Sequence, residues 1–396
     1  MKSIKIYSSN IKACISCLQA IFIDEALADK TIPKFISNKK LGAKDRAFIA
    51  QTVYDIVRYW RRYSYTLGYE NEDDAVLINW NKVIALYLKQ HYNILNEDFF
   101  DFSFDELHTI NTHLAWQIEQ SYPDWLHEIC LNELNDAWYN IGEQLNQLPT
   151  TYIRSNTIKI TTAELSQLLT NLNIEHTISK YINYCIEITS KNNLKNTKYF
   201  NNGLFEFQDI GSQKIVDYYK VNRSETILDM CAGKGGKTLQ LAALLKNKGK
   251  IFASDIDDKR LEVLQQRIKQ ANARNVQTIL FDEIIKHKPY DVILIDAPCS
   301  GTGTFRRVAD LKYKLSLEEI NNCIEDQALL LDQAAQLLSE NGKIIYATCS
   351  ILPSENEMQV QHFLQQHQQF KLIKSKSILP NQYNGDAFYM ALITND

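Results

Sequence analysis

Residues 226–238 read Thr226-Ile-Leu-Asp-Met-Cys-Ala-Gly-Lys-Gly-Gly-Lys-Thr238. The short apolar run at the start is typical of a buried strand, and glycines that open a helix after a strand let the backbone approach a ligand closely. A phosphate-binding loop would need a glycine five positions before Gly236, where this chain has Cys231. A dinucleotide-binding loop would need a third glycine where Thr238 stands. The stretch therefore favours a ligand-binding turn of another kind.

Four more short apolar runs follow this pattern between residue 208 and the end of the chain. They lie at 250–255, 278–282, 291–296 and 343–348, and helical stretches at 239–245, 260–271 and 320–338 separate them. Alternating apolar strands and helices predict an α/β fold with a parallel sheet covered on both faces. Such a sheet binds ligands outside the carboxyl ends of its strands. Since four of the five runs end in an acidic residue, we expect carboxylates to line that crevice.

The chain before this sheet divides into two further parts. Apolar residues recur at three- and four-residue steps over 8–68 and 116–145, and Ser121-Tyr-Pro-Asp124 marks a helix start, so this part is predicted to be all helical. From Thr151 short strand-like and helical stretches alternate, as in a small α/β segment. The expected domains are 1–148 (helical), 149–205 (small α/β) and 206–396 (parallel sheet).

The composition is that of a folded protein of the reducing cytoplasm. Apolar residues make up 45% and charged residues 23% of the 396 residues. The sequence shows no export signal and no apolar run long enough for a membrane span, so its eight cysteines are expected to be reduced thiols. Cys14 and Cys17 have the spacing of a metal or redox pair, but a second pair is missing and their neighbours follow a helical period. We interpret them as buried on one face of a helix.

The net charge of −4 hides an uneven distribution along the chain. Residues 1–62 carry 12 Lys and Arg against 5 Asp and Glu, whereas residues 63–148 carry 2 against 15. The remaining residues, 149–396, carry 29 against 27. A local basic face attracts phosphate even on an acidic chain, so the first segment is a candidate nucleic-acid surface. Ordinary solvated helix faces are the alternative.

Two carboxylates and two cysteines are candidate functional residues at the strand ends. Asp255 ends the second predicted strand and has the geometry to accept hydrogen bonds from a ribose, while Asp282 ends the third and is placed for an adenine amino group. Cys299 and Cys349 each lie just beyond a strand. A structural cysteine belongs inside an apolar run, so two at strand exits favour side chains that face the crevice.

Three motifs in order resemble the RsmB/NOP/Sun family of RNA cytosine-5 methyltransferases. They are Cys231-Ala-Gly-Lys-Gly-Gly-Lys237, Asp296-Ala-Pro-Cys-Ser-Gly-Thr-Gly303 and Ala347-Thr-Cys-Ser350. Phe207-Gln-Asp-Ile-Gly-Ser212 and Gly385-Asp-Ala-Phe-Tyr389 extend the resemblance. More loosely, residues 44–62 resemble the NusB-like helical domain of the bacterial ribosomal enzymes, whereas 63–110 resembles nothing in the family. The sequence departs from the family pattern at two places. The first motif has Gly-Lys where Ala-Pro is commoner, and Arg306-Arg-Val-Ala-Asp310 stands where Arg-Arg-His-Pro-Asp is usual. Neither departure removes a reacting group.

The resemblance implies a Rossmann-like class I methyltransferase domain with a mostly parallel seven-stranded sheet. It implies S-adenosyl-L-methionine as cofactor and 5-methylcytosine in RNA as product. The catalytic residues it implies are Cys349 as covalent nucleophile, Cys299 in adduct release and Asp296 on the cytosine. The cofactor-binding residues are Cys231, Ala232, Gly233, Lys234, Gly235, Gly236, Lys237, Asp255, Asp282 and Asp296. A nearby cation would favour the Cys349 thiolate, and Lys237 or Lys234 is available.

The substrate expected from this resemblance is small-subunit (16S) ribosomal RNA, bound by a cytoplasmic monomer without a membrane partner. Two alternatives stay open. One is methylation of another acceptor, such as tRNA, DNA or a protein, although covalent catalysis favours a pyrimidine carbon over an amine. The other is an RNA-binding protein whose sheet is catalytically silent, against which the intact cysteine pair argues.

Overall fold

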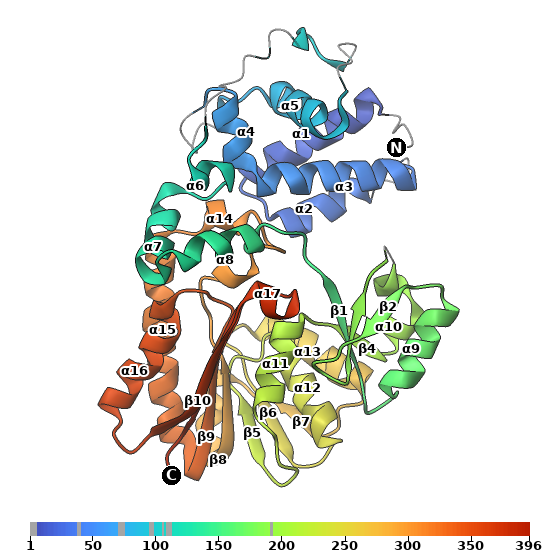
Figure 1. The fold of residues 1–396 in the computed structure, drawn as a ribbon. Coiled ribbons are helices and arrows are strands. Elements are labelled where there is room, and N and C mark those ends of the chain that lie inside the picture. Colours follow the sequence, from blue (N-terminus) through green and yellow to red (C-terminus); the bar gives the residue numbers. More distant parts are fainter. Residues whose placement is uncertain are drawn as a thin grey trace. The chain divides into compact units, whose positions relative to one another are not determined.

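The computed structural model describes residues 6–37, 41–69, 76–94, 99–104, 107, 113–190 and 193–396 (Figure 1). The chain forms two compact units. The first, the helical unit, comprises Met1–Gln147 and Phe305–Leu315, and the second, the sheet unit, comprises Leu148–Thr304 and Ser316–Asp396. Parts of the segment 63–110, for which the sequence suggests no role, lie outside the described residues. Among the described residues, no helix has the length and apolar character that a membrane span requires.

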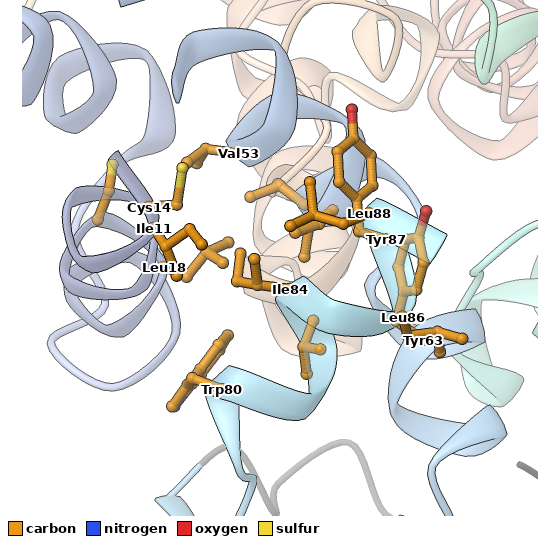
Figure 2. Close-up of a cluster of buried hydrophobic side chains, with 14 of the residues drawn as sticks. Ile11, Cys14, Leu18, Val53, Tyr63, Trp80, Ile84, Leu86, Tyr87 and Leu88 are labelled. Atoms are coloured by element: carbon orange, nitrogen blue, oxygen red, sulfur yellow. The ribbon is translucent and has the colours of Figure 1, made fainter. Parts of the chain in front are cut away.

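The described residues of the helical unit form helices and no strand, as their periodicity predicts. The helices are α1 (Ser8–Phe22), α2 (Ala28–Ile36), α3 (Ala43–Arg58), α4 (Trp60–Thr66), α5 (Trp80–Tyr92), α6 (Trp116–Glu119), α7 (Asp124–Leu134), α8 (Ala137–Leu145) and α14 (Leu311–Lys314). The predicted start at Asp124 is where α7 begins. Figure 2 shows part of the core, in which Ile11, Cys14 and Leu18 of α1 pack with α3 and α5. The likeness to a NusB domain stays a prediction.

A short segment that the sequence places in the sheet domain, Phe305–Leu315, belongs to the helical unit. Lys312 is fully buried there, and its ammonium donates to the carbonyl of Arg58 at 2.8 Å and to Oδ1 of Asn146 at 2.9 Å. Arg58 in turn donates to the carbonyl of Arg306 at 2.8 Å. Asp310 accepts from the backbone N–H of Ala28, the first residue of α2, at 2.9 Å. Buried cations are stable only when such acceptors surround them. Hydrogen bonds of charged side chains therefore hold this segment in the helical unit, and a pattern of apolar residues does not reveal them.

The buried arginines also change how the basic N-terminal segment is interpreted. Arg58 and Arg61 contribute to the positive charge of residues 1–62, yet they are only 4% and 6% exposed. Arg61 donates to the carbonyl of Tyr122 and pairs with Asp124, both at 2.5 Å. These two cations hold the helical unit together, so a phosphate-binding face there would depend on other residues.

The sheet unit begins with a small antiparallel sheet of strand order β2-β3-β1-β4. Its strands are β1 (Thr151–Ser155), β2 (His176–Ile178), β3 (Cys185–Ile188) and β4 (Phe205–Phe207). Helix α9 (Thr162–Asn171) packs on it and starts with a capping box, in which Thr161 and Glu164 satisfy each other's backbone N–H groups. The predicted small α/β segment is confirmed, with α10 (Lys198–Asn201) near its end.

The large sheet has seven strands in the order β10-β11-β9-β8-β5-β6-β7, which confirms the predicted fold class. The strands are β5 (Thr226–Asp229), β6 (Lys250–Ala253), β7 (Val276–Thr278), β8 (Tyr290–Asp296), β9 (Leu338–Thr348), β10 (Lys371–Ile378) and β11 (Phe388–Thr394). Strands β5 to β9 run parallel, and β11 is antiparallel to both of its neighbours.

Helices cover both faces of this sheet (Figure 1). One face packs against α15 (Leu317–Leu337) and α16 (Glu357–Gln366), and the other against α11 (Ile210–Tyr218), α12 (Gly236–Leu245) and α13 (Asp258–Ala271). Along β8, Ile293 and Ile295 face the first core whereas Val292 and Leu294 face the second. Because both faces are buried, the strands read as continuous apolar runs rather than as alternating ones.

Candidate active site

The carboxyl edge of the large sheet holds a cavity of about 710 Å³. Asp229 ends β5, Asp255 follows β6 and Asp296 ends β8, and all three side chains line the cavity, as the strand ends predict. Small-molecule sites usually have volumes of about 300 to 1,000 Å³. This cavity is therefore large enough for a nucleoside-sized ligand.

The glycine-containing turn between β5 and α12 forms one wall. Of the predicted cofactor residues on this turn, Cys231, Ala232, Gly233, Lys234, Gly236 and Lys237 line the cavity. Gly235 does not: it has a φ of +87°, and a Cβ there would lie 2.1 Å from a methyl carbon of Leu264. It serves the turn and its packing on α13 rather than the ligand.

Asp255 is only 5% exposed, and two backbone N–H groups hold its carboxylate in a fixed orientation. Oδ2 accepts the backbone N–H of Gly233 at 2.7 Å, and Oδ1 accepts that of Asp257 at 2.9 Å. An ionised carboxylate offers about four lone-pair sites, so acceptor capacity remains for hydroxyl groups of a ligand.

Asp282 occupies a different place from the one its sequence context suggests. Strand β7 ends at Thr278, because only Val276–Thr278 pair with β6, and Asp282 lies in the 3-10 helix η5 (Phe281–His287). The expectation that it ends the third strand is wrong. Its neighbour Phe281 lines the large cavity, while Asp282 is exposed and lines an adjoining cavity of about 260 Å³.

Cys299 and Cys349 meet at the exits of the adjacent strands β8 and β9. Their sulfur atoms are 3.3 Å apart, and the backbone N–H of Cys349 donates to Sγ of Cys299 at 3.4 Å. Pro298, the residue before Cys299, lines the cavity. Sequence spacing alone could not have shown that two thiols 50 residues apart are in contact.

Lys237 and Asp296 form an ion pair in the cavity wall. Nζ of Lys237 lies 2.5 Å from Oδ2 of Asp296, and the side chains are 8% and 34% exposed. Lys237, which the sequence makes available as a cation near Cys349, is thus paired with the carboxylate of Asp296. Lys234 is exposed at the rim of the cavity.

Burial changes the acidity of several groups around the cavity. It raises the pKa of Asp229 to about 7, against a hydrogen bond of 2.6 Å from the Thr238 hydroxyl that lowers it. Burial also raises the pKa of the Cys231 thiol. The pKa of Cys299 is raised first by its hydrogen bond with Cys349, then by burial and by the charge of Glu355. All three effects favour the protonated thiol of Cys299.

Several cavity residues were not predicted from the sequence. Ile256 and Arg260 lie beside Asp255, and helix α15 contributes Asp326, Leu329, Leu330 and Gln333. Gln208 and Ser212 also line the cavity, and the motif at residues 207–212 contained a signal for them. Helix α15 offered none, since an exposed apolar residue on a helix does not by itself mark a cavity.

Two family models match this chain. Residues 218–394 match the model described as 16S rRNA methyltransferase RsmB/F, and residues 122–195 match the ferredoxin-like domain of RsmF/B-like methyltransferases. Together they span more than half of the chain. This chain belongs to the RsmB/F methyltransferase family.

Relatives of known name agree with this membership. The chain is 31% identical over 276 residues to the ribosomal RNA small subunit methyltransferase B of Proteus mirabilis, and the alignment covers 69% of this chain and 65% of the relative. The protein of that name from Yersinia enterocolitica is 31% identical over 281 residues, covering 68% and 65%. The matched region thus spans slightly less than two thirds of these relatives.

The fold as a whole has solved counterparts. The crystal structure of PH0851 covers 99% of this chain and is itself covered completely, with a TM-score of 0.82 and 24% identity. That of NSun6 from Pyrococcus horikoshii with SFG covers 69% of this chain and is covered to 98%, with a TM-score of 0.63 and 21% identity. At these identities the likeness concerns the fold alone.

S-adenosyl-L-methionine is the cofactor that membership of the RsmB/F family implies, and the residues of the cavity fit it. Oδ1 of Asp229 is buried and without a hydrogen-bond partner in the protein, so it is an acceptor for a cationic amino group. A Cβ at Gly233 would meet nothing within 4 Å, which leaves the turn open to a close ligand. The carboxylate of Asp255 has acceptor capacity for ribose hydroxyls.

Proposed function

We propose that this protein methylates carbon 5 of a cytosine in 16S ribosomal RNA, with Cys349 as the covalent nucleophile. The observation that carries the proposal is the pair of thiols 3.3 Å apart beside the cavity. Methylation of an amine or a hydroxyl needs no thiol, whereas carbon 5 of cytosine is too weak a nucleophile to react unaided. Two cysteines in contact at this edge therefore support a pyrimidine carbon as the acceptor.

The reaction begins with addition of the Cys349 thiolate to carbon 6 of the cytosine. A sulfur–carbon bond forms, the electron pair of the ring double bond shifts toward carbon 5 and the ring nitrogen, and the nitrogen is protonated. S-adenosyl-L-methionine, when bound, would supply an electrophilic methyl group to carbon 5, and the electron pair of its broken sulfur–methyl bond would stay on the departing sulfur. Carbon 5 then carries both a methyl group and a proton. Loss of that proton and of the proton on the ring nitrogen, together with cleavage of the bond to Cys349, restores the aromatic ring and the thiolate.

The other residues of the site have distinct parts in this proposal. Asp296 accepts hydrogen bonds from the exocyclic amine and the protonated ring nitrogen, where positive charge grows. Lys237 holds that carboxylate in place. Cys299 lies 3.3 Å from the sulfur of Cys349 and, after methyl transfer, assists release of the adduct. The target base has to leave any helix that it occupies to reach these groups.

The 16S substrate is supported by the description of the family model and by the names of the relatives. The test is transfer of a labelled methyl group by purified protein to unmodified 16S RNA and, in parallel, to unmodified tRNA. We expect label in 16S RNA. In bisulfite sequencing, we expect one cytosine of 16S RNA that resists conversion in the parent strain to be converted in a deletion strain. Label in tRNA alone would mean that tRNA, and not 16S RNA, is the substrate. Cofactor binding without transfer to any RNA would favour the alternative of a catalytically silent RNA-binding protein.

A further inference from the structure

A layer of buried polar side chains, which the proposed reaction does not use, lies around the two cysteines. Each member is hydrogen-bonded to at least one other member and is no more than 4% exposed: Ser300, Thr302, Gln327, Ser350, Glu355 and Asn356. Burying this many polar groups lowers stability unless each has a partner. Apolar side chains of similar volume would stabilise the fold at least as well, so the layer is expected to have a specific role.

Glu355 holds the backbone on both sides of Cys299. Its Oε1 accepts the backbone N–H of Ser300 at 2.7 Å, and its Oε2 accepts the hydroxyl of the same residue. Oε1 also accepts the side-chain amide of Gln327 at 3.1 Å, and that amide donates to the carbonyl of Pro298 at 2.9 Å. Glu355 is completely buried, so these donors are what keeps its carboxylate in place.

Asn356 does the same for Cys349. Its Oδ1 accepts the hydroxyl of Thr348, the residue before the cysteine, and its Nδ2 donates to the carbonyl of Ser350, the residue after it, at 3.0 Å. The two loops are also joined directly, because the backbone N–H of Gly303 donates to the carbonyl of Cys349 at 2.9 Å.

We infer that the dipeptide Glu355-Asn356 is a positioning element that sets the distance between the two cysteine sulfurs. Asn356 contacts both neighbours of Cys349, and Glu355 contacts Ser300 directly and Pro298 through Gln327. The peptide bond between Glu355 and Asn356 thus links one cysteine loop to the other. The 3-10 helix η7 (Pro353–Glu355) and a hydrogen bond of 2.6 Å from the Tyr346 hydroxyl to the carbonyl of Glu355 hold the dipeptide itself. The catalytic meaning of this inference rests on the proposed function.

The charge of Glu355 has a second consequence for the pair. A carboxylate close to Cys299 disfavours a thiolate there, and this charge acts in the same direction as the hydrogen bond with Cys349 and burial, which raise the pKa of Cys299 more. Because the dipeptide holds this carboxylate in place, its charge adds to the two larger effects that favour the protonated thiol of Cys299, the residue proposed as the helper.

The test measures the spacing without RNA. Dibromobimane becomes fluorescent when it bridges two thiols, and mass spectrometry locates the bridged peptides, with Cys299→Ala as the blank. We expect efficient bridging of Cys299 and Cys349 in the full chain, and loss of that bridge in Glu355→Ala and Asn356→Ala. Glu355→Gln retains an acceptor of the same shape and is expected to restore the bridge. Gln359→Ala, which removes a buried amide that donates to the carbonyl of Ile324, is the matched control and should bridge like the parent chain.

Methyl transfer is the second readout. Misplacement of a reacting group by about 1 Å can cost on the order of 100-fold, so we expect kcat to fall by roughly 10- to 100-fold in Glu355→Ala and Asn356→Ala while KM for RNA stays unchanged. Unchanged bridging in folded Glu355→Ala and Asn356→Ala, or an equal loss in Gln359→Ala, would overturn the inference. Failure to restore the bridge in Glu355→Gln would also contradict it. A parent chain that bridges as expected but methylates no RNA would remove the proposed function and leave the positioning role standing.

Discussion

Two cysteine pairs of this protein have opposite surroundings. Cys14 and Cys17 lie one helical turn apart in α1, both fully buried, and Figure 2 shows Cys14 among Ile11, Leu18 and Val53. Burial raises the pKa of Cys17 to about 12, and that of Cys14 further. Apolar neighbours offer no donor to a thiolate, so these thiols behave as small hydrophobic side chains.

The pair at the sheet edge is half-buried and surrounded by hydrogen bonds. A backbone N–H and the partner thiol contact Sγ of Cys299, and the layer around Glu355 is hydrogen-bonded to the residues that flank the two cysteines. The ligand cavity begins one residue away, at Pro298. The comparison teaches that proximity of two thiols does not make a reactive site. Polar contacts that orient the sulfurs and access to a ligand do, and both follow from an exit position on a parallel strand.

The largest break in this comparison is expected from Cys349→Ala. We predict that it abolishes methyl transfer to RNA, because no thiolate remains to add to carbon 6, and that cofactor binding measured by calorimetry is nearly unchanged. Cys14→Ala deletes the same atom from the other pair and is the control, with transfer retained. Equal loss of transfer and cofactor binding in Cys349→Ala would contradict the assignment.

A smaller effect on chemistry, but a distinctive one, is expected from Cys299→Ala. This variant should still attack cytosine and accept the methyl group, then turn over slowly, because the step assigned to Cys299 follows methyl transfer. We predict a covalent protein–RNA band on denaturing gels with labelled RNA.

The double variant Cys299→Ala/Cys349→Ala is the control for that band, which should vanish. A band that persists in the double variant, or that forms only when Cys349 alone is replaced, would mean that the two cysteines are assigned the wrong way round. Lower activity without any trapped adduct would make Cys299 a packing residue like Cys14.

Asp255→Ala tests the cofactor-binding part of the site rather than the two cysteine pairs. We predict that it weakens S-adenosyl-L-methionine by roughly 1 to 3 kcal/mol, the scale for hydrogen bonds to a charged group, as measured by calorimetry. Asp257→Ala is the matched control, since Asp257 is a nearby carboxylate that caps α13 by accepting the N–H of Lys259. Unchanged affinity in Asp255→Ala would place the cofactor elsewhere.

Much of the fold could be predicted because the parallel strands are buried on both faces. The run at 226–229 is β5 itself, and 291–296 differs from β8 by one residue. Strand β10 could not be predicted in this way, since seven of its eight residues are exposed and pairing with β11 supplies its order. The same holds for Phe305–Leu315, whose place depends on Lys312 and its distant carbonyl acceptors.

The lining of the cavity was predictable where a carboxylate lies at a strand end, as at Asp255 and Asp296. Cys299 and Cys349 lie beside the cavity rather than in its lining, and their roles stay a proposal. Asp282 misled because it follows an apolar run at the edge of the sheet, where the strand stops after three residues. The buried layer around Glu355 was not predicted either. Its partners Ser300 and Gln327 are 55 and 28 residues away in the chain, and only the fold brings them together.

The smallest effect is expected from Cys14→Ala, which tests the other side of the comparison. All five tryptophans of the chain lie between residues 60 and 138, within the helical unit, so their fluorescence reports the unfolding of that unit alone. Removing one fully buried sulfur deletes packing contacts and leaves a small cavity, so we predict that the free energy of unfolding in urea falls by about 1 to 2 kcal/mol. The rate of methyl transfer per folded molecule should not change. An unchanged unfolding curve would mean that Cys14 does not pack as its burial indicates. A loss of transfer without a loss of stability would give the α1 pair a chemical role and remove the contrast between the two cysteine pairs.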